Sequence, residues 1–227
     1  MKKSDSDIKF MATNREIYDN IAESWYNYRH HTRFKRELDC LAGRWKGGRL
    51  LSLGCGHGAD FLPFKECFEL CGMDFSESMI NQARRYAYKY NFEPDLLLAE
   101  LSSLPFQENS FDWAISVAAY HHIKDRNSRL QALAELKRVL KPGSQAFITV
   151  WNRSQPMFWF RGNETLVDWR TKGEIYRRYY YLYTYGEIKA DARKAGFEIM
   201  NIGPEKSYSF PLKYFSRNIC LLVRKPR

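Results

Sequence analysis

A glycine-rich turn directly after a short apolar segment constrains the fold more than any other feature of this chain. Residues 50–53 read Leu-Leu-Ser-Leu, and residues 54–58 read Gly-Cys-Gly-His-Gly. An apolar run of this length is typical of a buried strand, and glycine lets the backbone after it turn tightly and approach a ligand closely. A helix that begins at such a turn offers unpaired N–H groups. The segment therefore predicts a strand, a ligand-binding turn and a helix.

Predicted strands and helices alternate beyond this turn as far as residue 151. Such alternation is typical of right-handed βαβ units in a parallel sheet that helices cover on both faces. Ser76 is a candidate N-cap for one of these helices. We expect helices at 14–29, 36–45, 76–90, 126–140 and 185–195. We expect strands at 50–53, 96–99, 111–117, 145–151, 197–202 and 218–224, and one more strand that ends at residue 74.

The charge balance favours a polyanionic partner. Lys and Arg total 36 against 26 Asp and Glu, a net charge of +10, and nucleic acid is the leading candidate for such a basic enzyme-sized chain. Tuning of solubility, or a surface rich in ion pairs, is the alternative. Met1–Asp7 is polar and lacks the apolar core of a signal peptide, and no apolar run approaches membrane-spanning length, so we expect a cytoplasmic protein without a membrane segment.

The cysteines do not predict a metal site. There are five, an odd number, without a Cys-x-x-Cys pair, and no cluster of further ligands accompanies them. We expect reduced thiols and no bound metal.

Several residues after the predicted strands indicate a nucleoside cofactor. Asp74 follows the glycine turn by roughly 20 residues, where a carboxylate can accept both ribose hydroxyls. The glycines also satisfy the dinucleotide pattern, so a nicotinamide cofactor stays open at this point. Glu100 and Leu101, before a Leu-Pro-Phe turn, suit the adenine amino group and a ring nitrogen. After residue 151 one helix and two strands remain, which suits an antiparallel closing hairpin and is too little for a second mononucleotide unit.

These features resemble the class I S-adenosylmethionine-dependent methyltransferases from residue 50 to residue 224. The resemblance implies a doubly wound α/β fold, Rossmann-like, with a seven-stranded sheet of order 3-2-1-4-5-7-6 and an antiparallel last strand. It implies S-adenosylmethionine as the methyl donor, and S-adenosylhomocysteine as the product. The implied donor site has the methionine end on Gly54, Gly56 and Gly58, the ribose on Asp74, the adenine on Glu100 and Leu101, and a wall at Ser116.

Further stretches resemble the tRNA methyltransferases that esterify 5-carboxymethyluridine at the wobble position of the anticodon loop. The stretches are Tyr-Asp-x-Ile-Ala-x-x-Trp at 18–25, Ala-Ala-Tyr-His-His-Ile at 118–123, Thr-Val-Trp-Asn at 149–152 and Arg-Tyr-Tyr-Tyr at 178–181. Two stretches depart from the family pattern. Residues 32–36 read Thr-Arg-Phe-Lys-Arg where Lys-Pro-Trp-Pro usually follows Thr-Arg, and residues 218–219 read Asn-Ile where Asn-Trp is usual.

A carboxylate acceptor explains the residue types in these stretches. It is already ionised at neutral pH, so methyl transfer needs alignment rather than a general base. Arg29, Arg33 and Arg178 are the predicted anchors, because guanidinium binds carboxylate or phosphate bidentately. His121 is predicted to orient the acceptor, with the alternative that one of His121 and His122 caps the next helix. The aromatic and basic segment 152–183 is expected to meet RNA, although most of its rings would pack on the sheet.

We accordingly predict one domain over residues 1–227. Its parts are N-terminal helices (1–46), a donor-binding core (47–151), an acceptor-side insertion without clear periodicity (152–183) and a closing helix and hairpin (184–227). The predicted edge strand 96–99 is apolar on both faces and therefore needs a cover. The resemblance implies that a small zinc-binding activator protein pairs with it in a heterodimer; the alternatives are the N-terminal helices or a second copy of the chain.

Three other functions remain open at this level. They are a methyltransferase for a small-molecule or quinone-type acceptor, which the Leu-Lys-Pro-Gly turn at 140–143 also fits, a nicotinamide oxidoreductase, and a nucleic-acid-binding module without turnover.

Overall fold

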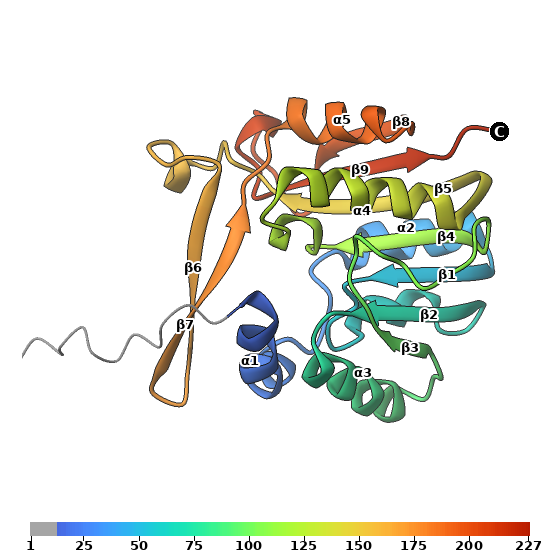
Figure 1. Ribbon diagram of the computed structural model, residues 1–227, viewed down its shortest axis with the longest axis horizontal. Coiled ribbons are helices and arrows are strands. Elements are labelled where there is room, and N and C mark those ends of the chain that lie inside the picture. Colours follow the sequence, from blue (N-terminus) through green and yellow to red (C-terminus); the bar gives the residue numbers. More distant parts are fainter. Residues whose placement is uncertain (1–12) are drawn as a thin grey trace, which may run out of the picture.

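A seven-stranded sheet with helices on both faces forms the centre of the computed structural model, which describes residues 13–227 (Figure 1). The predicted polar tail, Met1–Asp7, lies outside the described residues. The sheet order is β3-β2-β1-β4-β5-β9-β8, which confirms the predicted order once the two strands of a separate hairpin are left out of the count. The strands are β1 (Gly48–Leu53), β2 (Phe68–Asp74), β3 (Asp95–Leu98), β4 (Phe111–Val117), β5 (Leu140–Trp151), β8 (Glu198–Pro204) and β9 (Asn218–Arg224).

The last strand reverses direction, as predicted. β1 to β5 are parallel where they pair, whereas β9 runs antiparallel to both β5 and β8. The carboxyl ends of β1, β2, β4 and β5 therefore meet at one end of the molecule, which is where ligands bind in open α/β sheets.

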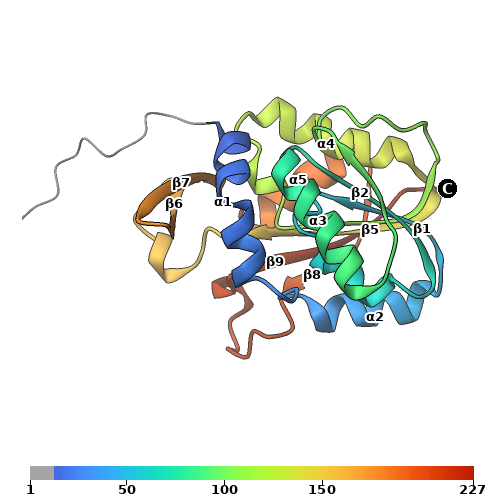
Figure 2. The same ribbon diagram turned by 90° about the horizontal axis from the view of Figure 1, so that it is seen from below.

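Two apolar layers hold helices on the sheet. One contains buried residues of α4 (Arg126–Val139) and α5 (Tyr185–Lys194), and the other those of α2 (Lys35–Trp45) and α3 (Glu77–Tyr90). Ser76 caps α3 as predicted, because its Oγ accepts from the Met79 backbone N–H at 3.1 Å. α1 (Asn14–Tyr28) lies across the carboxyl end of the sheet, beside the start of α3 (Figures 1 and 2).

The element after the glycine turn differs from the predicted helix. Residues 59–64 form a short 3-10 helix, η2 (Ala59–Phe64), and not an α-helix. Pro63 lies inside it and has no N–H to continue a hydrogen-bonded ladder, so the helical segment ends after six residues. β5 also begins earlier than predicted, at Leu140, because Leu140 pairs with Phe111 before an irregularity in the register of the two strands.

The insertion 152–183 is more regular than its sequence indicated. It contains a β-hairpin of β6 (Glu164–Thr171) and β7 (Glu174–Tyr181), joined by Lys172 and Gly173 at positive φ values of 49° and 81°. The alternation was hidden because the exposed face also carries apolar side chains, among them Leu166 and Ile175. The other face packs Trp169 and Tyr176 against the buried cluster on α1. The hairpin therefore stands beside α1 at the carboxyl end of the sheet (Figure 1).

None of the helices within residues 13–227 combines the length and apolarity that a bilayer span requires.

Candidate functional site

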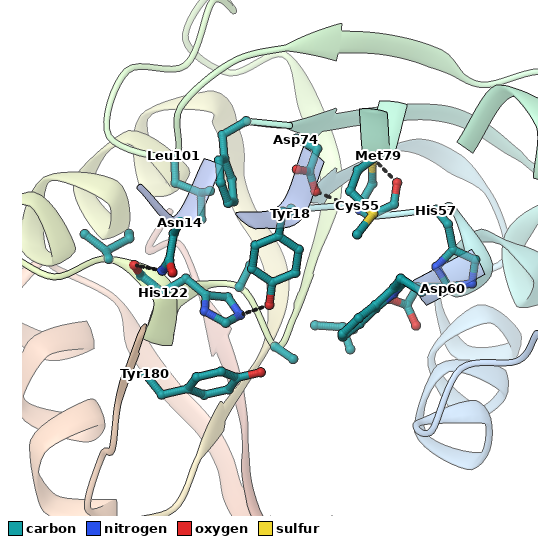
Figure 3. Close-up of a pocket in the computed structure, with 18 of the residues that line it drawn as sticks. Asn14, Tyr18, Cys55, His57, Asp60, Asp74, Met79, Leu101, His122 and Tyr180 are labelled. Carbon is teal, nitrogen blue, oxygen red and sulfur yellow. Dashed lines mark hydrogen bonds between the residues drawn. The ribbon is translucent and has the colours of Figure 1, made fainter. Parts of the chain in front are cut away.

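A cavity of about 720 Å³ opens at the carboxyl end of the sheet. The turn after β1, the end of β2, the segment after β4 and one side of α1 line it. This volume is in the range of small-molecule sites. Figure 3 shows Tyr18 of α1 near the middle of the cavity, with Asp74 and Cys55 on one side and His122 and Tyr180 on another.

Gly54 and Gly56 form the floor beside β1, with positive φ values of 67° and 53°. A Cβ on Gly56 would meet no atom within 4 Å and would project into open space, whereas one on Gly54 would come within 2.5 Å of the Ala119 Cβ. Both positions thus keep the turn tight and its backbone accessible to a ligand. Gly58 does not line the cavity: a Cβ there would make only an ordinary contact with Ala83 of α3 at 3.6 Å, and its φ of 89° is what favours glycine at this position.

Asp74 lines the cavity from the end of β2. Its Oδ2 accepts from the Gly56 N–H at 2.9 Å, and its Oδ1 accepts from the Ser76 N–H at 3.0 Å. Burial raises the pKa of Asp74 to about 6, and these N–H bonds oppose the rise. Each carboxylate oxygen retains a lone pair for a further donor, so a diol of a nucleoside ribose fits its chemistry.

The two residues predicted to hold the adenine both line the cavity, but only one of them is buried. Leu101 is buried and lines the cavity. Glu100 also lines it, but half of its side chain is exposed and it pairs with Arg15 of α1 at 2.5 Å. Ser116 is not part of the lining: it is fully buried, and its Oγ donates to the Leu53 carbonyl at 3.2 Å. Because side chains alternate along β4, Val117 and the residues after it form the wall instead.

The two histidines after β4 exchange the roles that were expected. His121 is fully buried against Tyr180, with ring centroids 4.8 Å apart, and its Nδ1 accepts from the Trp151 N–H at 3.3 Å. His122 lines the cavity, where its Nε2 lies 2.8 Å from the Tyr18 hydroxyl and its Nδ1 lies 3.0 Å from the Tyr179 carbonyl (Figure 3). A carbonyl only accepts, so Nδ1 donates to it and Nε2 accepts from Tyr18.

Both histidines are held in the neutral form. Burial lowers the pKa of His122 to about 3, and burial together with the neighbouring His122 moves the pKa of His121 well below its usual range. His122 can orient a ligand by hydrogen bonding, and both histidines are weak bases at neutral pH.

Several of the residues that line the cavity are arginines. Arg29, Arg33 and Arg217 line it, and Arg29 and Arg217 stack on Trp25 and Trp151 with Cζ at 4.7 and 5.1 Å from the ring centroids. None of the three forms an ion pair with a carboxylate in the described part of the chain. Burial lowers the pKa of Arg29, and the charges of Arg33, Arg217 and Arg178 lower it further. Asp60 also lines the cavity and is affected by the charge of Arg29, and Glu205 acts on Arg217, but neither carboxylate forms an ion pair with these arginines. Cations grouped in this way favour binding of an anion.

Arg178, a predicted anchor, does not line the cavity. It is buried against Trp25 and Trp169, with Cζ at 5.5 and 5.1 Å from their rings, and donates to the Tyr180 hydroxyl at 2.9 Å. Its Nε is buried without a hydrogen-bond partner in residues 13–227. The packing of α1 against the hairpin therefore buries the Arg178 guanidinium behind the side chains that line the cavity.

Most of the residues that line the cavity were not among the predicted site residues, and Tyr18, Asp60 and His122 are the ones with the clearest chemical potential. Tyr18 and His122 lay in stretches already noted, but their sequence did not reveal which side chains face the cavity. Burial raises the pKa of Asp60 to about 6, although a hydrogen bond with Thr32 and the charge of Arg29 both lower it. Its place shortly after the glycine turn was the available signal.

Comparison with known proteins decides the family. A family model described as a methyltransferase domain matches residues 51–148. A methyltransferase of Encephalitozoon cuniculi is 32% identical over 168 residues, which cover 71% of this chain and 75% of that protein. The chain belongs to the methyltransferases. S-adenosylmethionine is its cofactor, and the nicotinamide alternative is set aside.

One further sequence relative and two solved structures are also similar to this methyltransferase. The Arabidopsis thaliana tRNA (carboxymethyluridine(34)-5-O)-methyltransferase is 32% identical over 153 residues, covering 67% of this chain but only 36% of that protein. An S-adenosylmethionine-dependent methyltransferase of Clostridium acetobutylicum has a TM-score of 0.72 at 14% identity, covering 92% of this chain and 99% of that one. A Haloferax volcanii methyltransferase, solved in complex with a methyltransferase activator, has a TM-score of 0.69 at 18% identity, covering 94% and 97%. At these identities the two structures show the shared fold.

No metal site accompanies the cavity in the part of the methyltransferase that is described. Residues 13–227 contain no group of three or more His, Cys, Asp or Glu side chains placed to hold a metal ion. The five cysteines are free thiols, and Cys55, Cys71 and Cys220 are buried.

Proposed function

We propose that this methyltransferase esterifies the carboxylate of 5-carboxymethyluridine at the wobble position of tRNA. The observation that carries the proposal is the group of unpaired arginines, Arg29, Arg33 and Arg217, at one end of the cavity, with Arg178 buried behind them. An acceptor bearing a carboxylate next to phosphates would supply the missing negative charge.

The donor would occupy the opposite end of the cavity. Gly54 and Gly56 would hold its methionine part, Asp74 its ribose, and Leu101 with Glu100 its adenine. S-adenosylmethionine supplies an electrophilic methyl group on a sulfonium. The glycine turn and Asp74 would fix the donor's position, so that the arginines can align the acceptor oxygen with it.

The neutral histidines favour an acceptor that is already ionised. His121 and His122 have lowered pKa values and are poorly suited to deprotonate a hydroxyl or an amine. A carboxylate requires no such base. His122, held by Tyr18 and the Tyr179 carbonyl, would orient the acceptor instead.

Two further facts support RNA as the carrier of that carboxylate. The chain has a net charge of +10, and the Arabidopsis relative is named for the same carboxymethyluridine reaction. The hairpin β6–β7 and the loop before it form the proposed acceptor side, with residues 47–151 as the donor-binding core of one domain.

Labelled methyl transfer tests the proposal. The purified chain, alone and with its activator, is incubated with methyl-labelled S-adenosylmethionine and tRNA that carries or lacks 5-carboxymethyluridine. We expect alkali-labile label on the modified nucleoside only, and none with Asp74→Ala. Label on a different nucleoside, or transfer to small carboxylic acids but not to tRNA, would contradict the proposed acceptor.

We also propose a partner at the edge of the sheet. β3 is four residues long and pairs on one side with β2; in the described residues its other side has no strand partner, and Leu98 is 51% exposed. An edge of this kind invites a further strand. The Haloferax methyltransferase forms a complex with an activator protein, which supports a small zinc-binding activator as the cover of β3.

A further inference from the structure

Two loops far apart in the sequence meet beside the acceptor end of the cavity. One connects β5 to β6, and the other connects β8 to β9. Asn152 at the end of β5 joins them, because its Nδ2 donates to the carbonyls of Tyr214 and Ser216 at 2.6 and 2.8 Å. Both loops lie at the end of the molecule that carries α1 and the hairpin (Figures 1 and 2).

Together the loops expose an unusual number of large apolar side chains. Phe160 is 99% exposed, and its five companions are each more than half exposed. The Phe215 ring lies between the two loops, with centroids 5.7 Å from Trp159 and 6.5 Å from Phe210. We call this set the loop surface: Met157, Trp159, Phe160, Phe210, Leu212 and Tyr214. A gathering of exposed rings on a folded protein indicates a binding surface.

The charges of the loop surface are all of one sign. Segments 153–161 and 206–215 contain Arg153, Arg161, Lys206 and Lys213 and no Asp or Glu. The adjacent Glu205 is buried, and its Oε2 accepts from the Asn218 N–H at 2.8 Å, so it does not neutralise these cations. Exposed rings next to unopposed cations match the bases and phosphates of unpaired nucleic acid.

The loop surface lies near the cavity, to which the buried ring of Phe158 connects it. Arg217 lines the cavity and its Cζ lies 5.1 Å from the centroid of the Trp151 ring, which in turn lies 6.2 Å from that of Phe158. Trp159 and Phe160 follow Phe158 in the chain. A strand of RNA with one nucleotide in the cavity would therefore reach these rings with its neighbouring nucleotides.

We propose that the loop surface stacks the unpaired bases that flank the methylated nucleotide, while its cations contact their phosphates. The inference rests on the proposed RNA substrate and adds where the rest of the anticodon loop is bound. Stacking of this kind tolerates any base, because each base has a flat face. It would add affinity without choosing the nucleotide that is methylated.

The test uses a fluorescent anticodon stem-loop RNA and the full chain with its activator and S-adenosylhomocysteine. Phe160→Ala removes an almost fully exposed ring, and the double variant Trp159→Ala, Phe160→Ala removes two. We expect the double variant to weaken RNA binding by about tenfold or more with an unchanged salt slope, and to raise the KM for tRNA by a similar factor at constant kcat. Tyr88→Ala, which removes a 90% exposed ring on α3, is the matched control and should bind as the wild type.

A second pair of changes separates charge from stacking. Arg153→Ala with Arg161→Ala should lower the salt slope of binding by about two, which the ring variants should not do. Wild-type RNA affinity in the ring variants would overturn the proposal. So would ring variants that lose self-association between copies of this chain but bind RNA as the wild type does, because the rings would then form a protein interface. If the ring variants lose RNA affinity but the wild-type protein does not methylate tRNA that carries 5-carboxymethyluridine, the proposed reaction is wrong and the proposed RNA-binding role of the loop surface is retained.

Discussion

At the scale of single residues, the proposed acceptor end depends on arginines that form no ion pair with a carboxylate in residues 13–227. Arg178 and Arg177 are adjacent on β7 but point to opposite faces: Arg178 is buried against two tryptophans, and Arg177 lies 3.8 Å from Asp168 on the exposed face. This alternation provides a matched pair of variants.

We expect Arg178→Ala to lower kcat/KM for tRNA by at least about tenfold, or about 1.4 kcal/mol, because Tyr180 loses its donor and the acceptor end loses a charge. S-adenosylhomocysteine affinity, measured by calorimetry, should stay unchanged. Arg177→Ala should retain wild-type kinetics. Wild-type kinetics of Arg178→Ala would show that this buried charge does not support the proposed acceptor end.

Asp74 is the residue on which donor binding should depend most. Asp74→Ala removes a charged acceptor from the proposed ribose site, and we expect S-adenosylmethionine affinity to fall by at least about tenfold. Titration calorimetry measures the change, with Asp95→Ala at the exposed start of β3 as the control. An unchanged dissociation constant for Asp74→Ala would exclude the ribose role.

The same carboxylate predicts a pH dependence. The pKa of Asp74 is raised to about 6, so lowering the pH through that value protonates it and removes the charge that accepts the ribose hydroxyls. Donor affinity should therefore fall several-fold from about pH 7.5 to about pH 5. Asp60 also has a pKa of about 6, so its titration must be distinguished from that of Asp74. Asp74→Asn should bind weakly and without this pH dependence, whereas Asp60→Asn should retain it; the reverse would assign the titration to Asp60.

At the scale of elements, α1 turns an open sheet end into a closed cavity. Asp19 of α1 fixes it to the start of α3, because its Oδ1 accepts from the Ser76 Oγ at 2.6 Å and the Ser78 N–H at 3.0 Å. Trp25 fixes its other end to the hairpin, with a ring centroid 4.9 Å from that of Trp169. α1 thus links the donor end to the acceptor side.

Asp19→Ala should loosen this link and weaken both donor binding and RNA methylation, although Asp19 itself is not part of the cavity lining. We expect donor affinity to fall about three- to tenfold, from the loss of two hydrogen bonds to a carboxylate. Hydrogen exchange should report faster exchange in α1. Asn20→Ala, which removes only a bond to the exposed Glu16 carbonyl, is the control. Unchanged exchange and affinity would show that packing alone holds α1.

At the scale of the whole molecule, the uncovered side of β3 links stability to the proposed partner. We expect the chain expressed alone to be poorly soluble or to bind its donor weakly, because Asp74 lies at the end of β2, the strand that pairs with β3. Co-expression with a small zinc-binding activator should restore both properties, and residues 95–98 should gain hydrogen-exchange protection in the complex. A monodisperse, fully active single chain, or no added protection at β3, would contradict the partner.

Much of the fold follows from local patterns. The apolar runs, the glycine turn and the Ser76 cap predicted most of the elements and many of their boundaries, because burial and backbone conformation act over a few neighbouring residues. The strand order came from the resemblance to class I methyltransferases, and the structure confirms it. The glycine turn and Asp74 were also predicted to lie at a ligand site, and Gly54, Gly56 and Asp74 do line the cavity in which we propose that the donor binds. The hairpin β6–β7 escaped prediction because apolar residues occupy both of its faces.

The side chains that face the acceptor were decided by tertiary packing. His121 and His122 are chemically identical neighbours, and only the placement of Tyr18 and Tyr180 makes one a wall of the cavity and the other a buried support. The same holds for Arg178, which the contact between α1 and the hairpin withdraws behind the wall, and for Ser116, which β4 turns into the sheet. Orientation of this kind depends on contacts between segments about sixty or more residues apart, which the local sequence does not reveal.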